Sequence, residues 1–257
     1  MRRVPALFLG AAVLATATAA TGVTPVSAAE AHGYTCSGGT IAPGTYESIT
    51  VSGFCAIPSG AVHVENNLRL LPNSGLNATF DTGTLTVGAD VLVGRNAVLG
   101  MGCSKIDNPP GACNPPHDRI GGNLDADNAR GVLVYTTHVH GKISIRGGSG
   151  AVGCSQTLFP HGPPVYSTLE DNFIEGSTTV IGYTGCWFGF IRNHVDATVR
   201  YDRNMLADPD ASEIVTNVIG ESLVCHNNSP APHVGDSGGV PNKVEDSKVG
   251  QCDAPGL

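Results

Sequence analysis

Hydrophobic residues in this chain recur in short alternating runs. After the N-terminal segment, no window of a dozen residues shows the 3.6-residue apolar period of a helix. Four segments align on one pattern, in which an aliphatic residue stands second and an alternating run follows, mostly after Gly or Ala. They are residues 138–145, 173–180, 194–201 and 218–225, with an earlier copy at 120–126 and similar runs at 64–70, 83–87, 89–93 and 96–99. The pattern predicts short strands joined by turns.

An asparagine recurs at the same phase of this repeat, as Asn172, Asn193 and Asn217, at intervals of 21 and 24 residues. Intervals of about twenty residues that hold two or three strands are typical of one coil of a β-solenoid. We therefore predict an all-β, single-domain right-handed parallel β-helix in which these amides form a ladder from coil to coil. A β-sandwich or an antiparallel barrel is the alternative, but neither explains the equal phase of the asparagines.

The aligned segments also predict which side chains meet, because stacked coils lie about 4.8 Å apart. One column of inward side chains is aliphatic except for the polar residue Thr178. Tyr201, two residues after this column, points inward as well. The aliphatic members of the column are Leu124, Ile143, Val199 and Leu223.

The N-terminus has the features of an export signal. Arg2 and Arg3 precede an apolar run at 4–20, and small residues at 26–28 suit a signal peptidase. We predict a signal peptide at 1–29, secretion, and a mature domain at 30–257 that has no membrane association after cleavage. A retained membrane anchor is the alternative, but the apolar run is short for a spanning helix.

All 8 cysteines follow the predicted signal peptide, and an even number in an exported chain indicates four disulfides. Spacing alone leaves many connectivities open, but their order favours local pairs. The absence of any CxxC motif argues against zinc–thiolate binding. The favoured pairs are Cys36–Cys55, Cys103–Cys113, Cys154–Cys186 and Cys225–Cys252. Loops rich in Pro and Gly interrupt the repeat at 102–117 and 153–168, and we expect residues 227–257 to form an irregular C-terminal cap.

The mature chain is acidic. Removal of Arg2 and Arg3 leaves 12 Lys and Arg against 22 Asp and Glu, a net charge of −10. This balance argues against nucleic acid and anionic membranes as partners. It also disfavours polyanionic polysaccharides unless a divalent cation bridges them.

Two stretches carry a resemblance to a known class, Cys186 to His194 and Asp208 to Asn217. Together with strands that begin in the style of Gly-Asn-Leu, the common phase of the asparagines and the Gly-rich composition, they resemble secreted actinobacterial right-handed parallel β-helix proteins of the pectate-lyase-like class. The resemblance covers most of residues 35–252 and implies a long sheet face suited to an extended polysaccharide. It supplies no catalytic motif that transfers residue by residue.

The predicted register places candidate catalytic groups in two outward columns. One contains His138, Phe173 and His194, and the next contains His140, Glu175 and Asp196. A histidine of these columns would act as the base, and Glu175 or Asp196 as the acid or as ligands of Ca²⁺. The histidines would also suit a borderline metal. The alternative is a polar face that only keeps the sheet soluble.

Further side chains are candidates for binding sugar. Lys142, Arg146 and Arg200 would neutralise a uronate, and Trp187 is either a sugar-stacking platform or packing beside a disulfide. We therefore predict a secreted carbohydrate-active enzyme, a lyase or hydrolase, that acts on an extracellular polysaccharide. A non-catalytic structural or glycan-binding β-helix protein is the alternative.

The pentapeptide Gly235 to Gly239 matches the segment around the nucleophile of trypsin-like proteases. Only 20 residues follow Ser237, too few for the remaining strands of that fold, and no matching histidine segment precedes it. We therefore predict that the chain is not a serine protease.

Overall fold

A computed structural model describes residues 33–105, 111–113, 116–148, 154–155, 158 and 166–257. The predicted signal peptide, residues 1–29, lies outside this part of the chain. Within it, strands dominate, and no helix has the length and apolar character needed to cross a membrane.

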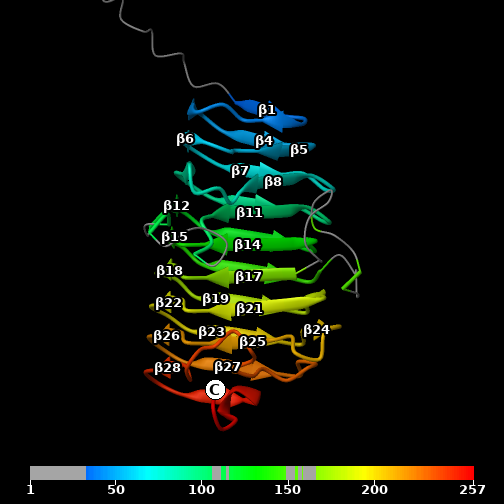
Figure 1. The fold of residues 1–257 in the computed structure, drawn as a ribbon, viewed down its shortest axis with the longest axis vertical. Coiled ribbons are helices and arrows are strands. Elements are labelled where there is room, and N and C mark those ends of the chain that lie inside the picture. Colours follow the sequence, from blue (N-terminus) through cyan, green and yellow to red (C-terminus); the bar gives the residue numbers. More distant parts are fainter. Residues whose placement is uncertain (1–32, 106–110, 114–115, 149–153, 156–157, 159–165) are drawn as a thin grey trace, which may run out of the picture. The chain divides into compact units, whose positions relative to one another are not determined.

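The described strands form three long sheets, and neighbouring strands in them run parallel (Figure 1). In spatial order, the ten-stranded sheet contains β1 (Tyr34–Cys36), β4 (Ile49–Val51), β7 (Leu68–Leu70), β10 (Val91–Val93), β13 (Leu124–Asp127), β16 (Ile143–Arg146), β19 (Thr178–Ile181), β23 (Val199–Asp202), β27 (Leu223–His226) and β29 (Lys248–Gly250). The eight-stranded sheet contains β2 (Gly39–Thr40), β5 (Phe54–Ala56), β8 (Gly75–Ala78), β11 (Val98–Gly102), β14 (Gly131–Tyr135), β17 (Tyr166–Glu170), β21 (Trp187–Ile191) and β25 (Glu213–Val215). The nine-stranded sheet contains β28 (Lys243–Val244), β26 (Val218–Ile219), β22 (His194–Val195), β18 (Phe173–Ile174), β15 (Thr137–Val139), β12 (Asp118–Ile120), β9 (Gly83–Val87), β6 (Gly60–Val64) and β3 (Gly44–Tyr46).

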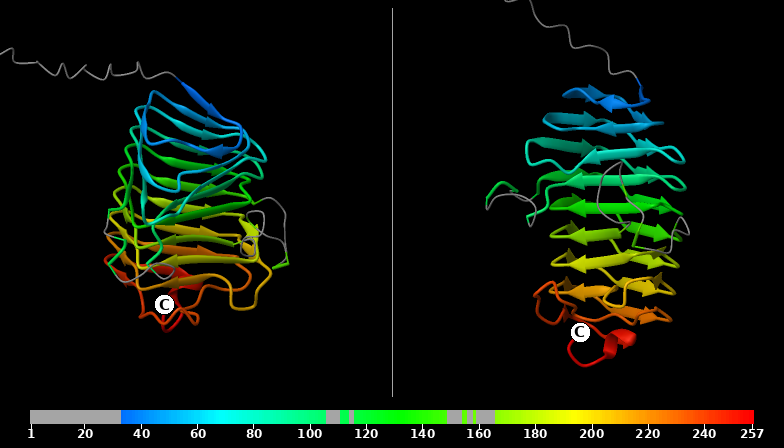
Figure 2. Two further views of the ribbon diagram at one scale, coloured as in Figure 1. Left: turned by 45° about the horizontal axis from the view of Figure 1, so that its top comes forward. Right: turned by 45° about the vertical axis from the view of Figure 1, so that its right-hand side comes forward.

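The chain visits the three sheets in turn, so that one coil adds one strand to each sheet. For example, β13, β14, β15 and β16 belong to the ten-, eight-, nine- and ten-stranded sheets. Figures 1 and 2 show the coils stacked in chain order, from blue to red. This arrangement confirms the predicted parallel β-helix. A small sheet of β20 (Thr184–Gly185) and β24 (Met205–Leu206) is added to two of the coils.

The predicted register is confirmed strand by strand. His138 pairs with Phe173 and Phe173 with His194 in the nine-stranded sheet. In the ten-stranded sheet, Thr178 lies between Ile143 and Val199. Side chains that point inward form a mainly aliphatic core with a few aromatic members, and Tyr201 is buried in it as predicted.

The predicted asparagine ladder is present and buried. The side-chain amide of Asn172 donates to Asn193 Oδ1 at 2.9 Å, and that of Asn193 donates to Asn217 Oδ1 at 3.1 Å. Asn242 extends the ladder by one coil. A left-handed residue precedes each of the first three amides and turns the chain between two sheets: Asp171, Arg192 and Thr216, with φ of 57°, 55° and 61°.

A second ladder, which the sequence did not predict, runs along another corner. The side-chain amide of Asn204 donates to Asn228 Oδ1 at 2.9 Å, and that of Asn228 donates to Gln251 Oε1 at 3.0 Å. The residues before these amides, Arg203 and Asn227, again have a positive φ. The same turn geometry therefore recurs at two corners of the coil.

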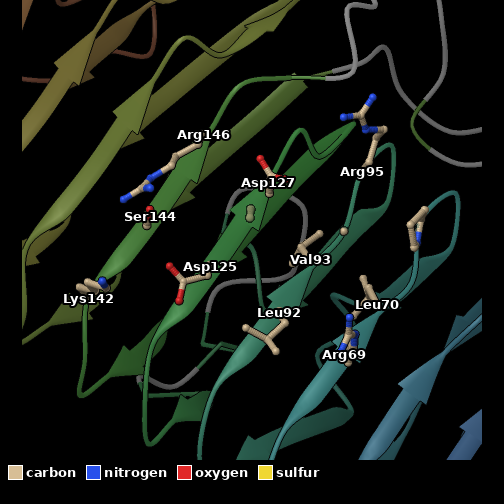
Figure 3. A pocket seen from close by; sticks show the side chains of 13 residues that line it. Arg69, Leu70, Leu92, Val93, Arg95, Asp125, Asp127, Lys142, Ser144 and Arg146 are labelled. Atoms are coloured by element: carbon tan, nitrogen blue, oxygen red, sulfur yellow. The ribbon is translucent and has the colours of Figure 1, made fainter.

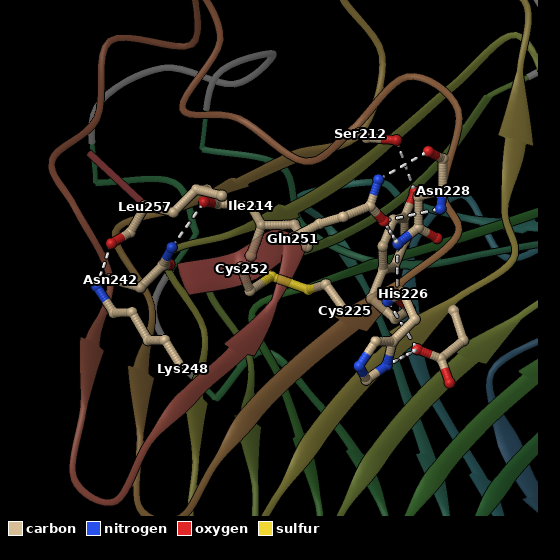
Figure 4. Close-up of a disulfide and its surroundings, with 12 residues drawn as sticks. Ser212, Ile214, Cys225, His226, Asn228, Asn242, Lys248, Gln251, Cys252 and Leu257 are labelled. Carbon is tan, nitrogen blue, oxygen red and sulfur yellow. Dashed lines mark hydrogen bonds and ion pairs between the residues drawn. A yellow bond between two sulfur atoms is a disulfide. The ribbon is translucent and has the colours of Figure 1, made fainter. Parts of the chain in front are cut away.

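The four predicted disulfides are all confirmed: Cys36–Cys55, Cys103–Cys113, Cys154–Cys186 and Cys225–Cys252. The last one joins the final two coils (Figure 4). Four disulfides indicate an oxidising, extracellular environment.

One expectation needs correction. The run at 64–70 is not one strand, because β6 ends at Val64 and β7 begins at Leu68 after a corner. Residues 227–257, the expected irregular C-terminal cap, contain only β28, β29 and the short 3₁₀-helix η1 (Gln251–Asp253) as regular elements, and both strands pair with the coil before them.

Candidate functional site

A groove of about 690 Å³ lies on the outer face of the ten-stranded sheet (Figure 3). Strands β7, β10, β13 and β16 cross it side by side. The parallel register aligns the outward side chains of these strands. One column across the groove runs through Arg69, Leu92, Asp125 and Ser144.

Charged side chains concentrate in this groove. Asp127 and Arg146 are neighbours in the register of β13 and β16, two positions after Asp125 and Ser144. Arg95 and Lys142 reach the groove from turns. Asn128 donates to Asp127 Oδ1 at 2.8 Å. The lining therefore holds four basic side chains and two carboxylates, in a chain whose net charge is −8. A local excess of cations in an acidic protein attracts and orients anionic ligands.

A second group of polar residues lies on the nine-stranded sheet, and we call His138, His140 and Glu175 the histidine cluster. His138 Nε2 is 2.8 Å and His140 Nδ1 is 2.9 Å from Glu175 Oε1. The two imidazole rings lie 4.2 Å apart between centroids. The register explains the contact: His140 follows β15 and Glu175 follows β18, so His138 and His140 face the same side and Glu175 takes the position of His140 one coil later.

The cluster continues into an exposed stack of rings. Phe173 is 39% exposed and lies between His138, at 4.9 Å edge-to-face, and His194, at 5.0 Å and stacked. His194 Nε2 is 3.0 Å from Asp196 Oδ1. The five predicted catalytic residues therefore form two groups, the histidine cluster and the His194–Asp196 pair.

The predicted sugar-binding residues lie elsewhere. Lys142 and Arg146 line the groove of the ten-stranded sheet, whereas Arg200 forms an ion pair with Asp202 on β23. Trp187 is half-buried on the eight-stranded sheet, where its indole covers Gly189 and donates to the carbonyl of Asp210 at 3.1 Å. These positions assign the predicted catalytic and sugar-binding residues to different sheets.

Ser237 has no histidine partner among the described residues. Its hydroxyl donates to Glu213, a buried carboxyl whose pKa is raised by burial. His233 Nε2 contacts the carbonyl of Ala211 at 2.7 Å instead.

Sequence reasoning missed Arg69 and Arg95 as members of the groove. The alternation at 68–70 places Arg69 on the outer face of its strand, but the repeat at 138–225 carries no information on the register of this earlier coil. An alignment of Leu68, Val91 and Leu124 would have placed Arg69 near Asp125. Arg95 lies in a turn, and no strand periodicity marks it.

Comparison of the chain with protein-family models, with curated proteins and with solved structures finds no match.

Proposed function

We propose that this protein is a secreted carbohydrate-active enzyme that binds an acidic polysaccharide in the groove of the ten-stranded sheet and hydrolyses it there. The observation that carries the proposal is the ring of Arg69, Arg95, Lys142 and Arg146 around two carboxylates. Guanidinium groups bind carboxylates and sulfates through paired hydrogen bonds. The net negative charge of the chain disfavours a polyanionic substrate, but the local excess of positive charge in the groove attracts one.

Asp125 and Asp127 supply the acid and the base. They lie two residues apart on β13 and share its outer face, and the strand rise of about 3.3 Å per residue places their Cα atoms about 7 Å apart. Inversion requires about 6.5–9.5 Å between the two carboxyl groups themselves, which leaves room for a water molecule, and two carboxylates on one face of a strand can reach that separation. One carboxyl group donates its proton to the glycosidic oxygen, and the other removes a proton from the attacking water. The resemblance to pectate-lyase-like β-helix proteins supports the substrate class.

A glycan-binding protein without catalysis is the second candidate. The basic side chains outnumber the carboxylates two to one, which favours retention of a polyanion over its cleavage. The histidines predicted as bases also lie on the nine-stranded sheet, outside the groove.

Binding and cleavage are tested separately on the mature protein. Polygalacturonate, alginate and neutral xylan are presented with and without Ca²⁺, and retention in affinity gels is compared with release of reducing ends. We expect the gels that contain an acidic glycan to retain the protein and the xylan gel not to retain it. Arg69→Gln or Arg146→Gln should bind about tenfold more weakly, because each substitution removes one charge-assisted hydrogen bond to the glycan. Lys243→Gln, an exposed site on β28, is the control and should bind normally.

The catalytic step is tested with Asp125→Asn and Asp127→Asn. Both variants should retain the glycan and lose cleavage. Retention without any cleavage by the wild-type protein would favour the second candidate. If no acidic glycan binds, or if the Arg69 and Arg146 variants bind as the control does, the groove has no role in glycan recognition.

A further inference from the structure

We propose that the histidine cluster is a binding site for a divalent transition metal of the Zn²⁺ type. The nitrogen and oxygen atoms that His138, His140 and Glu175 offer all lie within 4.8 Å of one another. The site is on the nine-stranded sheet and is independent of the glycan groove.

The parallel register brings the three ligands together. His138 lies on β15 and His140 directly follows its last residue, Val139, so the alternation of the extended chain sends both rings to the same face of the sheet. Glu175 occupies the position of His140 one coil later, because Val139 pairs with Ile174. No loop has to close over the site, because His140 and Glu175 directly follow the paired strands β15 and β18 and their backbone N–H groups donate to the carbonyls of Ile120 and Val139.

The distances suit a small cation. A tetrahedral Zn²⁺ with bonds of about 2.0–2.1 Å separates its ligand atoms by roughly 3.3 Å. The two histidine nitrogens lie 2.8 and 2.9 Å from Glu175 Oε1. An opening of about half an ångström therefore makes room for the ion. The side chains of His140 and Glu175 are 39% and 41% exposed, which lets an ion and a fourth, water ligand reach the site from solvent.

The ligand types select the ion. Two imidazoles and one carboxylate suit Zn²⁺ and its neighbours in the transition series. Ca²⁺ takes six to eight oxygen ligands, and the pair Glu175 and Asp196, which the sequence suggested for Ca²⁺, supplies only two carboxylates. Asp196 is already bonded to His194. The cluster therefore favours a transition metal over Ca²⁺.

Arg119 competes with the metal. Its guanidinium lies 3.2 Å from His140 Nε2 and has only donors, so Nε2 accepts and Nδ1 carries the proton that points to Glu175. A metal on Nδ1 requires the proton on Nε2, and the guanidinium must then turn away. Arg119 is exposed on β12 and has room to do so. Its positive charge also opposes the cation.

This competition gives a test in which a substitution strengthens binding, a result that misfolding of the variant would not produce. Zn²⁺ binding to the untagged mature protein, stripped with a chelator, is measured by titration calorimetry, and Co²⁺ absorption reports the coordination geometry. We expect one Zn²⁺ per chain and a tetrahedral Co²⁺ spectrum. Arg119→Ala should bind Zn²⁺ several-fold more tightly.

We expect Zn²⁺ binding to weaken by about 100-fold or more in each of the variants His138→Ala, His140→Ala and Glu175→Ala. Loss of a residue that only hydrogen-bonds to a metal ligand costs at most about 100-fold, so a larger loss identifies a direct ligand. His63→Ala, an exposed histidine of β6 on the same sheet, is the matched control and should leave binding unchanged. The proposal is overturned if the wild-type protein binds no Zn²⁺, if the cluster variants bind like His63→Ala, or if Arg119→Ala binds more weakly. Circular dichroism confirms that each variant is folded.

Discussion

At the scale of single residues, Thr178 is the one polar member of an aliphatic column. It is fully buried between Ile143 and Val199, and within the described part of the chain its hydroxyl has no hydrogen-bond partner. An unpaired buried hydroxyl costs about 1–3 kcal/mol. We expect Thr178→Val, which keeps the shape and removes the hydroxyl, to raise the free energy of unfolding by about 1 kcal/mol in denaturant titrations.

Thr137→Val is the matched control. Thr137 is also fully buried, but its hydroxyl donates to the carbonyl of Tyr135 at 2.8 Å. Its loss should lower the free energy of unfolding by about 1 kcal/mol. Destabilisation by both substitutions would contradict the assignment of Thr178 as unpaired.

His117 gives a pH dependence at the same scale. The hydrogen bond from its Nδ1 to the buried Asp118 carboxylate, 2.9 Å long, raises the pKa of His117. Since the folded pKa of His117 lies above the unfolded value of about 6.5, this stabilisation is present below that value as long as Asp118, whose own pKa is raised by burial, is ionised, and it is lost as pH rises through the folded pKa of His117. We expect the difference in unfolding free energy between wild type and His117→Ala to be larger near pH 5 than near pH 9. A difference that grows with pH would contradict this assignment.

At the scale of structural elements, the asparagine ladder holds the corners of successive coils together. Asn193 donates to the carbonyl of Leu169 and to Asn217, and its Oδ1 accepts from the backbone and side chain of Asn172. Asn193→Ala would leave several buried groups without partners, at about 1–3 kcal/mol each. We expect a loss of at least about 3 kcal/mol in unfolding free energy, measured by denaturant titration.

Asn67→Ala is the control for the ladder. Asn67 Oδ1 accepts from the backbone of Asp90 at 3.0 Å, but the residue is exposed. Water replaces this bond, so we expect a loss below about 1 kcal/mol. Equal losses at the two sites would show that burial of the ladder adds nothing to its stability.

At the scale of the whole molecule, each coil contacts mainly the coils next to it. The stability of such a stack is close to a sum over neighbouring coils, and its ends open first. Cys225–Cys252 closes a loop over 27 residues and ties the last coil to the one before it. The bond is worth about 3–4 kcal/mol in the chain-entropy model. We expect its removal to act on the C-terminal end of the stack.

Hydrogen exchange checks this expectation. In a Cys225→Ala, Cys252→Ala variant, amides of β27 and β29 should exchange faster, while those of β10 and β13 keep their protection. A Cys103→Ala, Cys113→Ala variant removes the staple of a loop that spans 10 residues and should leave β27 and β29 protected. Uniform loss of protection in the first variant would mean that the stack unfolds as one cooperative unit.

The sequence by itself determined the fold and the register of the later coils, and the order of the cysteines favoured the disulfide pairs without deciding them. The fold and the register follow from local periodicity: alternation defines strands, and the equal phase of Asn172, Asn193 and Asn217 sets which strands stack. Once that phase was known, the contact of His138 and Glu175 followed from the count of residues along two paired strands.

Only the tertiary structure decided which outward columns share one surface. The corners between sheets separate the histidine cluster from Lys142 and Arg146, although His140 and Lys142 are two residues apart in the chain. Turns vary in length from coil to coil, so the periodicity of the strands carries no information on where a corner falls. For the same reason the groove takes Arg95 from a turn and Arg69 from a distant coil, because it is formed by contacts between coils.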